Sequence, residues 1–250
     1  YRQHYQLGVE AFGSEAPEVD AEVIGVLAAL YGELGLTGLE LRLNSMGCSA
    51  CRPGYSTVLR EFLAQRSDEL CAECRERAVI NPLRTYDCKS ASCKAVLAEA
   101  PRLPEHLCPA CADHHDRVQQ ALRAQDIEFA PDHTLVRGMD YYTRTTFEYQ
   151  SGLLGAQSGV GSGGRYDDLV SSIGGPSVPG VGFGTGVERI LLALARAGGQ
   201  LPGPRPPAVY VVALAAETRD RAFALAHALR SRGVAAELDY MDRSVKGQMK

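Results

Sequence analysis

The sequence has no long hydrophobic run, no excess of positive charge and no low-complexity tract. None of its apolar stretches approaches the ~18–20 residues that a membrane span requires, so we expect no membrane-spanning segment. The formal net charge of −4 excludes a globally basic nucleic-acid-binding protein, although a local basic groove remains compatible with it. Residues 1–10 are polar and lack the apolar stretch of a signal peptide. The 250 residues, 45% hydrophobic and 22% charged, are typical of a folded protein with one large domain or two smaller ones.

Cysteine is confined to one segment of the chain. All eight cysteines lie between Cys48 and Cys111 without an export signal, so metal binding or free thiols are favoured over a disulfide framework. Four pairs at this spacing could supply two tetrahedral zinc sites with four thiolates each. Buried reduced cysteines, or a module that has lost its metal, are the alternatives, and the spacing does not settle the pairing. The pairs are Cys48-x2-Cys51, Cys71-x2-Cys74, Cys88-x4-Cys93 and Cys108-x2-Cys111.

The first 45 residues read as strand, helix, strand. Residues 1–12 alternate like a half-buried strand, and with no turn or cap before them we expect that sequence precedes this chain. Residues 17–34 carry apolar side chains at helical spacing, with Pro17 in the first turn and Gly35 at the C-terminal cap. Residues 39–44 alternate again, as a strand does.

Residues 46–130 predict an inserted, mainly helical module. Helical patterning covers residues 55–70 and 113–125. Between Cys48 and Arg117 the acidic and basic residues are equal in number, so the module has no basic bias toward nucleic acid.

Glycine-rich, strand-like segments dominate from residue 135 to residue 186. Residues 159–164 match GxGxxG, but no long helix follows, so this match to a dinucleotide-binding fingerprint is weak. Two interpretations of residues 159–164 remain. They form a flexible loop, or they allow the backbone to approach a ligand closely. The glycines at 180, 182, 184 and 186 would share one face of a strand. That face suits a flat planar ligand, or it makes room for a neighbouring helix.

The last fifty residues begin a second domain. Residues 187–197 predict a helix, and residues 198–207 are so rich in glycine and proline that they mark the best domain boundary. A strand (208–214), a helix (217–232) and a strand (235–240) then start a βαβ unit. This stretch is short for an α/β domain, so we expect it to be truncated.

One further segment, residues 135–144, is rich in polar and aromatic side chains and precedes a predicted strand. It holds two arginines, an aspartate and two tyrosines. The arginines could bind carboxylate or phosphate, and the tyrosines could stack on a ring or form hydrogen bonds. A solvated loop is the plain alternative.

Four stretches together resemble the bacterial histidyl-tRNA synthetases, which are class II aminoacyl-tRNA synthetases. They are residues 1–10, 135–143, 163–169 and 180–189. The resemblance implies an α+β fold: an antiparallel catalytic sheet with flanking helices, a helical Cys-rich insertion and the start of an α/β anticodon-binding domain. It also implies that the chain begins inside motif 2. The expected divisions are catalytic residues 1–45 and 131–197, insertion 46–130, linker 198–207 and anticodon-binding residues 208–250.

The same resemblance implies a two-step reaction. Histidine and ATP, taken with Mg²⁺, give histidyl-adenylate, and the histidyl group then passes to the 3′ end of tRNA(His). A cytoplasmic homodimer without membrane association is expected. The alternatives are the synthetase-like regulatory subunit of ATP phosphoribosyltransferase, which senses histidine without catalysis, and a zinc-ribbon binding module, which would explain only the cysteine segment.

The resemblance also assigns roles to individual residues. Arg137 would be the catalytic arginine at the α-phosphate, and Gly164 and Arg165 would shape the histidine pocket. Histidine would be bound by Gln6, Glu10, Arg137, Tyr141, Tyr142 and Tyr166. ATP would be bound by Gln6, Gly184, Gly186 and Arg189, with the glycines at 182, 184 and 186 as the floor of the adenine site.

Overall fold

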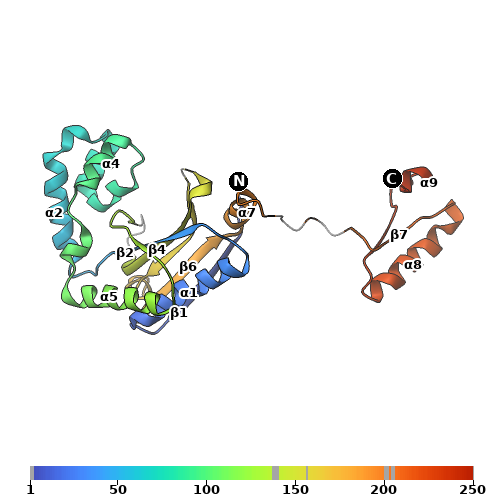
Figure 1. The fold of residues 1–250 in the computed structure, drawn as a ribbon, viewed down its shortest axis with the longest axis horizontal. Helices are drawn as coiled ribbons and strands as arrows, with labels where there is room; N and C mark the ends of the chain where they lie inside the picture. The colour runs from blue at the N-terminus through green and yellow to red at the C-terminus, as the bar shows by residue number, and fades with distance from the viewer. Residues whose placement is uncertain (1–2, 137–140, 156, 200–202, 204–205, 250) are drawn as a thin grey trace. The chain divides into compact units, whose positions relative to one another are not determined.

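Alternating side chains near the start of the chain form the edge strand of a mainly antiparallel sheet (Figure 1). The computed structural model describes residues 3–136, 141–155, 157–199, 203 and 206–249. In this part of the chain the sheet has six strands in the order β1-β6-β5-β4-β2-β3, and only the β2–β3 pair is parallel. The predicted antiparallel α+β architecture is therefore confirmed. The strands are β1 (Gln6–Phe12), β2 (Leu39–Ser45), β3 (Ala130–Pro131), β4 (Thr143–Ser151), β5 (Gly159–Arg165) and β6 (Gly180–Gly186).

Helix α1 (Pro17–Glu33) packs on one face of this sheet. As predicted, it has proline in its first turn, and Gly35 follows its end with a φ of +70°. Its buried Ile24 and Leu27 belong to a core with Phe147 and Phe183, which come from strands β4 and β6. Helix α5 (Pro109–Ala124) packs against α1 and adds Val118 and Leu122 to the same core, and α7 (Val187–Arg196) adds Ile190.

The residues between β2 and α5 form a helical module with its own core. Figure 1 shows α2 and α4 grouped beside the sheet. Tyr55, Leu59 and Leu63 of α2 are almost fully buried in the second cluster, and Tyr142 and Tyr166 also belong to it. The module therefore packs directly against two tyrosines that the sequence assigned to the site. The helices are α2 (Arg52–Gln65), α3 (Ala72–Ile80) and α4 (Ala91–Ala98).

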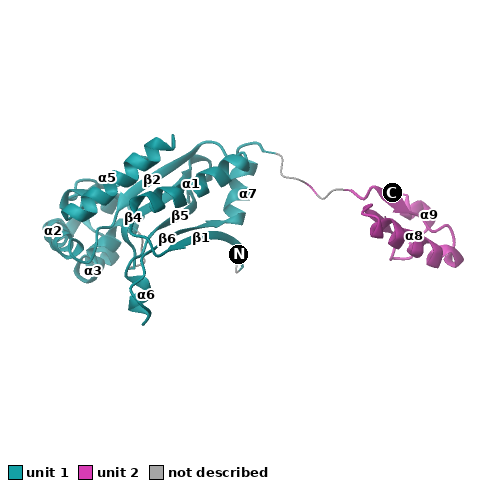
Figure 2. Cartoon of the chain, turned by 90° about the horizontal axis from the view of Figure 1, so that it is seen from below, with its two compact units in different colours: residues 1–200 teal, residues 201–250 magenta. Residues whose placement is uncertain are grey.

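Residues 201–250 form a separate compact unit, coloured magenta in Figure 2. Strands β7 (Val209–Val211) and β8 (Ala236–Leu238) pair in parallel across helix α8 (Arg219–Ser231). This is the predicted βαβ arrangement, with shorter strands than the sequence pattern indicated. A last short helix, α9 (Val245–Gln248), follows.

Within the described residues the first strand begins at Gln6, later than the pattern over residues 1–12 indicated. Residues 159–165 form strand β5 in the middle of the sheet, not a flexible loop. Its glycines make room for large neighbours: a Cβ at Gly163 would lie 2.7 Å from the Phe147 ring and 2.8 Å from the Phe183 Cα. Within the described residues, no helix combines the length and apolar character that crossing a bilayer requires.

Candidate functional site

A cavity of about 680 Å³ opens on the sheet face opposite α1. The alternation of strands places Gln6, Gly8 and Glu10 of β1 on this face, together with Gly182 and Gly184 of β6. Residues 141–142 and the segment after β5 complete the walls. The lining residues are Gln6, Gly8, Glu10, Phe12, Tyr141, Tyr142, Ser162, Tyr166, Leu169, Val170, Ile173, Gly182, Phe183 and Gly184.

The glycines of β6 give space to side chains of the neighbouring strand. Gly182 pairs with Glu10 and Gly184 pairs with Gly8 across the β1–β6 ladder. A Cβ at Gly184 would collide with the Gln6 amide nitrogen, and a Cβ at Gly182 would collide with the Glu10 carboxylate. Because both positions lack a Cβ, the Gln6 and Glu10 side chains lie across β6 in the cavity. The glycine face is therefore a floor partly covered by polar groups, not by a helix.

Three tyrosines form an aromatic wall beside Glu10. The Tyr141 and Tyr142 ring centroids are 4.8 Å apart with planes inclined by 40°, and Tyr141 meets Tyr166 edge to face at 6.1 Å. The Tyr166 hydroxyl donates a hydrogen bond to the Glu10 carboxylate. Burial, followed by this contact with Glu10, raises the pKa of Tyr166, so its phenol stays protonated and remains a donor. A carboxylate beside aromatic faces is suited to a small molecule that carries an ammonium group and a planar ring.

Arg165, which was expected to shape the histidine pocket, does not line the cavity. Strand alternation turns its side chain to the α1 side of the sheet, where it is fully buried. Its Nε donates to Asp20 Oδ1 at 3.0 Å, and its Nη1 donates to Asp167 Oδ1 at 2.9 Å and to the Ser14 carbonyl at 2.9 Å. Arg165 therefore supports the cavity floor from behind.

The other predicted ligands of ATP lie at the far end of β6. Gly186 pairs with Gln6 at the end of the ladder, and Arg189 donates from Nε to the Gly159 carbonyl at 3.0 Å. Among the described residues that line the cavity, neither Gly186 nor Arg189 is found. Arg137 lies outside the described residues. The cavity thus brings together Gln6, Glu10, Tyr141, Tyr142, Tyr166, Gly182 and Gly184.

Several lining residues were not predicted from the sequence, Phe12 and Ser162 among them. Phe12 shares the strand face of Gln6 and Glu10, and Ser162 occupies the cavity face of β5. The alternation that placed Gln6 and Glu10 on one face could have found Phe12, since it lies at the same parity. Ser162 could be placed only once β5 was known to be a strand.

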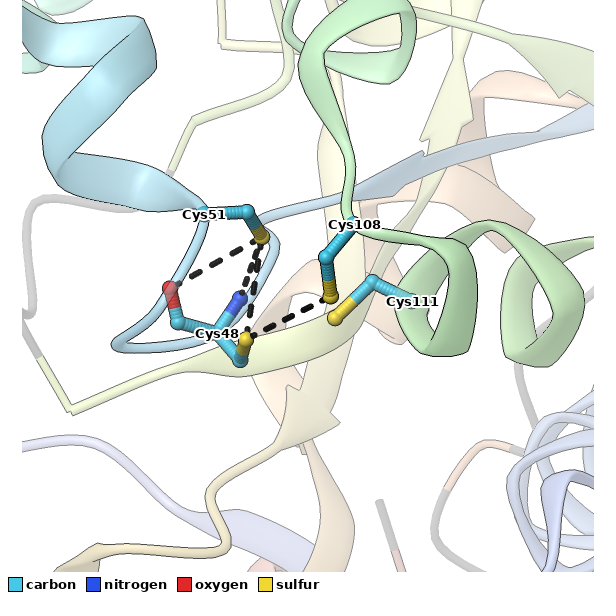
Figure 3. A group of neighbouring side chains, drawn as sticks. All are labelled: Cys48, Cys51, Cys108 and Cys111. Carbon is cyan, nitrogen blue, oxygen red and sulfur yellow. Dashed lines mark hydrogen bonds between the residues drawn. The ribbon is translucent and has the colours of Figure 1, made fainter.

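The cysteines gather into two groups of four. Cys48 and Cys51 meet Cys108 and Cys111, and their side chains point toward one another (Figure 3). The second group consists of Cys71, Cys74, Cys88 and Cys93. Within each group the four Sγ atoms lie within 4.8 Å of one another, and all eight cysteines, which are all described, are free thiols.

Backbone donors surround several of these sulfur atoms. The N–H of Cys48 donates to the Sγ of Cys51 at 3.2 Å, and the N–H of Cys71 donates to the Sγ of Cys93 at 3.2 Å. Burial opposes ionisation of Cys93, but hydrogen bonds from the Cys71 N–H and the neighbouring thiols outweigh it and lower the pKa of Cys93 to about 7. The donors therefore favour the thiolate form of Cys93, whereas burial raises the pKa values of Cys74, Cys88 and Cys111.

The chain is similar to known proteins along its whole length. The sequence profile of the histidyl-tRNA synthetase family matches residues 1–190. Histidine–tRNA ligases of Moorella thermoacetica and Caldanaerobacter subterraneus are 51% and 47% identical over 249 residues, which is 100% of this chain and 59% and 60% of theirs. The apo structure of Staphylococcus aureus histidyl-tRNA synthetase superimposes with a TM-score of 0.78 at 34% identity, covering 100% of this chain and 62% of that one. This chain thus spans about 60% of the length of its curated relatives.

Proposed function

Because this chain belongs to the histidyl-tRNA synthetase family, we propose that it carries a large part of the active site of a histidine–tRNA ligase. The whole protein would join L-histidine to ATP as histidyl-adenylate with release of pyrophosphate, and would then transfer histidine to the 3′ end of tRNA(His). The observation that carries this proposal is the single cavity in which Gln6, Glu10 and the three tyrosines converge over the glycine strand.

The histidine site is proposed to lie between Glu10 and the tyrosine wall. The Glu10 carboxylate would accept hydrogen bonds from the substrate ammonium group, as charge-assisted bonds favour. Tyr141, Tyr142 and Tyr166 would enclose the imidazole, and the fixed Tyr166 hydroxyl would keep Glu10 in place. Such fixed contacts hold the substrate carboxylate in position for attack on a phosphate.

The nucleotide is proposed to lie along β6. Gly184 and Gly186 would allow the adenine to approach the strand closely, with Gln6 and Arg189 at its sides. ATP would enter as its Mg²⁺ complex, as a substrate. Arg137 would face the α-phosphate, where positive charge offsets the charge dispersed over the oxygens in the transition state.

The domain divisions and the partners belong to the same proposal. Residues 1–45 and 131–197 would be catalytic, residues 46–130 an insertion, and residues 208–250 part of an anticodon-binding domain joined by the linker 198–207. The βαβ arrangement of β7, α8 and β8 supports the last of these. We also propose that the protein acts as a homodimer in the cytoplasm.

Histidine-dependent ATP–pyrophosphate exchange by the full-length protein tests this function. Arg137→Ala should lower the exchange rate by at least tenfold at unchanged thermal stability, because an arginine at the α-phosphate acts on the transition state. The exposed Arg60 of α2 provides the matched control, Arg60→Ala, which should exchange at the wild-type rate. Histidine binding without any exchange would contradict the proposal and would instead identify a histidine-sensing regulatory subunit.

A further inference from the structure

The two cysteine groups have the dimensions of tetrahedral zinc–thiolate sites. A Zn–S bond of about 2.3 Å places the sulfur atoms of a tetrahedron about 3.8 Å apart. The Sγ of Cys48 lies 3.7 Å from that of Cys51 and 3.8 Å from that of Cys108. The Sγ atoms of Cys71 and Cys88 are 3.8 Å apart. We propose that the eight cysteines bind two zinc ions, one in each group.

The sulfur spacing discriminates between the possible occupants. A disulfide has an S–S distance of about 2.05 Å, so sulfurs 3.7–3.8 Å apart are unbonded, in agreement with the eight free thiols. Four sulfurs within 4.8 Å leave room for one ion rather than an iron–sulfur cluster. Four thiolates also leave no open coordination position, which assigns the ions a structural role and not a catalytic one.

The backbone around the first cysteine group allows its four sulfur atoms to lie close together. Figure 3 shows Cys48 and Cys51 before α2 facing Cys108 and Cys111 at the start of α5. Gly47 has a φ of +63°, and a Cβ there would lie 2.7 Å from the Cys51 Sγ. Backbone N–H donors to the sulfurs complete the environment that thiolate ligands need. The second group repeats this arrangement, with N–H donors to Cys93 and Cys88.

The first zinc site is connected to the cavity through Arg52, which follows Cys51 directly. Its Nε donates to the Met46 carbonyl at 3.2 Å, and its Nη2 donates to the Tyr142 carbonyl. Tyr142 lines the cavity, so fixing the Cys48–Cys51 turn also fixes one wall of it. Arg52 is thus a positioning residue. This connection rests on the proposed function, whereas the two zinc sites do not.

Metal analysis tests the zinc sites directly. The protein purified without chelator should contain two zinc ions per chain, and X-ray absorption should show four sulfur ligands about 2.3 Å from zinc. Cys48→Ser with Cys108→Ser should remove one ion, and Cys71→Ser with Cys93→Ser should remove the other. Ser92→Ala, which lies between Cys88 and Cys93 and changes no sulfur, should keep both. Zinc-free protein, or absorption data with nitrogen or oxygen ligands, would overturn the proposal even if every variant failed to fold.

Histidine kinetics of the full-length protein test the connection to the cavity. The Cys48/Cys108 double variant should raise the KM for histidine at least tenfold, while the KM for ATP stays within twofold. Arg52→Met should reproduce this split at unchanged thermal stability, and Arg52→Lys should restore part of it. If the KM values for histidine and ATP rose equally, or if neither rose, the connection between the first zinc site and the cavity would be contradicted. The proposal of two zinc sites would not be affected by that result. A wild-type protein with no histidine-dependent exchange would instead contradict the proposed function.

Discussion

Asp20 and Arg165 form an ion pair that is completely buried behind the cavity, with both side chains 0% exposed. Arg165 Nε lies 3.0 Å from Asp20 Oδ1, and Thr145 donates its hydroxyl to Asp20 Oδ2 at 2.5 Å. The pair joins α1 to the end of β5, directly before Tyr166 of the tyrosine wall. A buried charge that loses its partner is costly, so the pair makes the position of Tyr166 depend on α1.

Removing one partner of this pair should destabilise the protein strongly. Asp20→Ala leaves the Arg165 guanidinium buried without its main counter-charge, and we expect the free energy of unfolding to fall by about 3–5 kcal/mol. Urea unfolding followed by circular dichroism measures this change. The exposed pair of Glu18 and Arg117 on α1 and α5 is the control, and Glu18→Ala should leave the midpoint almost unchanged. If Asp20→Ala and Glu18→Ala lowered the free energy of unfolding equally, the stabilising role of the buried Asp20–Arg165 pair would be contradicted.

His114 should make stability depend on pH. It lies on α5 with Nε2 3.5 Å from Asp20 Oδ2, and Arg165, Arg144, Arg117 and His115 also act on it. Burial, followed by the charge of Arg165, lowers its pKa from 6.5 to about 3. Between these values the unfolded chain binds the extra proton, so stability is complete above pH 6.5 and falls as the pH decreases toward 3.

The slope of this dependence is measurable. His114 can contribute up to about 1.4 kcal/mol per pH unit to the free energy of unfolding in this window. His114→Gln should reduce the slope obtained from urea unfolding between roughly pH 6 and pH 4, whatever its effect on absolute stability. His4→Gln, at an exposed position, is the control and should keep the wild-type slope. A slope that His114→Gln does not change would exclude this histidine as its source.

Glu10 should control histidine binding. Glu10→Gln keeps the shape of the side chain but removes the charge that would pair with the substrate ammonium group. We expect the KM for histidine in pyrophosphate exchange to rise roughly 10- to 100-fold. Tyr166→Phe removes only the hydrogen bond to Glu10 and should have a smaller effect in the same direction. Glu33→Gln, exposed at the end of α1, is the control and should leave the KM for histidine unchanged.

A methyl group at residue 184 should disturb the site without unfolding the sheet. In Gly184→Ala the new Cβ meets only the flexible end of the Gln6 side chain, so the amide must leave the cavity floor. We expect a higher KM for ATP at a nearly unchanged melting temperature. Gly182→Ala would also place a Cβ 2.6 Å from the Val9 carbonyl, a backbone atom, so it should lower the melting temperature as well.

The helical Gly32 supplies the control for these glycine substitutions. Nothing lies within 4 Å of a Cβ at Gly32, and alanine favours helix over glycine by about 1 kcal/mol. Gly32→Ala should therefore keep the wild-type KM for ATP and raise the melting temperature slightly. A KM that Gly184→Ala leaves unchanged would show that the nucleotide does not reach this part of β6.

Gly47 should be needed for zinc at the first cysteine group. Gly47→Ala introduces a Cβ 2.7 Å from the Cys51 Sγ at a φ of +63°, so the turn before α2 must rearrange. We expect the variant to retain one zinc ion per chain, held by the second group. Gly54→Ala, inside α2 with nothing within 4 Å of the new Cβ, should retain both ions. Two ions in the Gly47→Ala protein would contradict the predicted geometry.

Local patterns predicted the elements of the fold well. Helix α1 and strand β2 were recognised because their periodicity and end residues lie within a few positions of one another. The two-residue strand β3 carries no such pattern, since it exists only because β2 lies beside it. The glycine strand β5 was harder still, because its strand state is imposed by pairing with β4 and β6.

The site was predictable in composition but not in arrangement. Residue types and strand parity placed Gln6 and Glu10 together on one face of β1. Their position over Gly182 and Gly184 depends on the register between β1 and β6, the first and last strands of the sheet in sequence. The same holds for the cysteines: the spacing predicted pairs, but which pairs meet is decided by the packing of helices distant in sequence.

The meeting of Cys48 with Cys108 has a consequence for the order in which the chain folds. Strand β2 must pair with β4, and the whole insertion separates them. Closing so long a loop is entropically unfavourable and slows the formation of non-local strand pairs. When the insertion folds first and brings Cys48 next to Cys108, the effective loop between the strands becomes shorter. We therefore expect early folding of the insertion to accelerate assembly of the sheet.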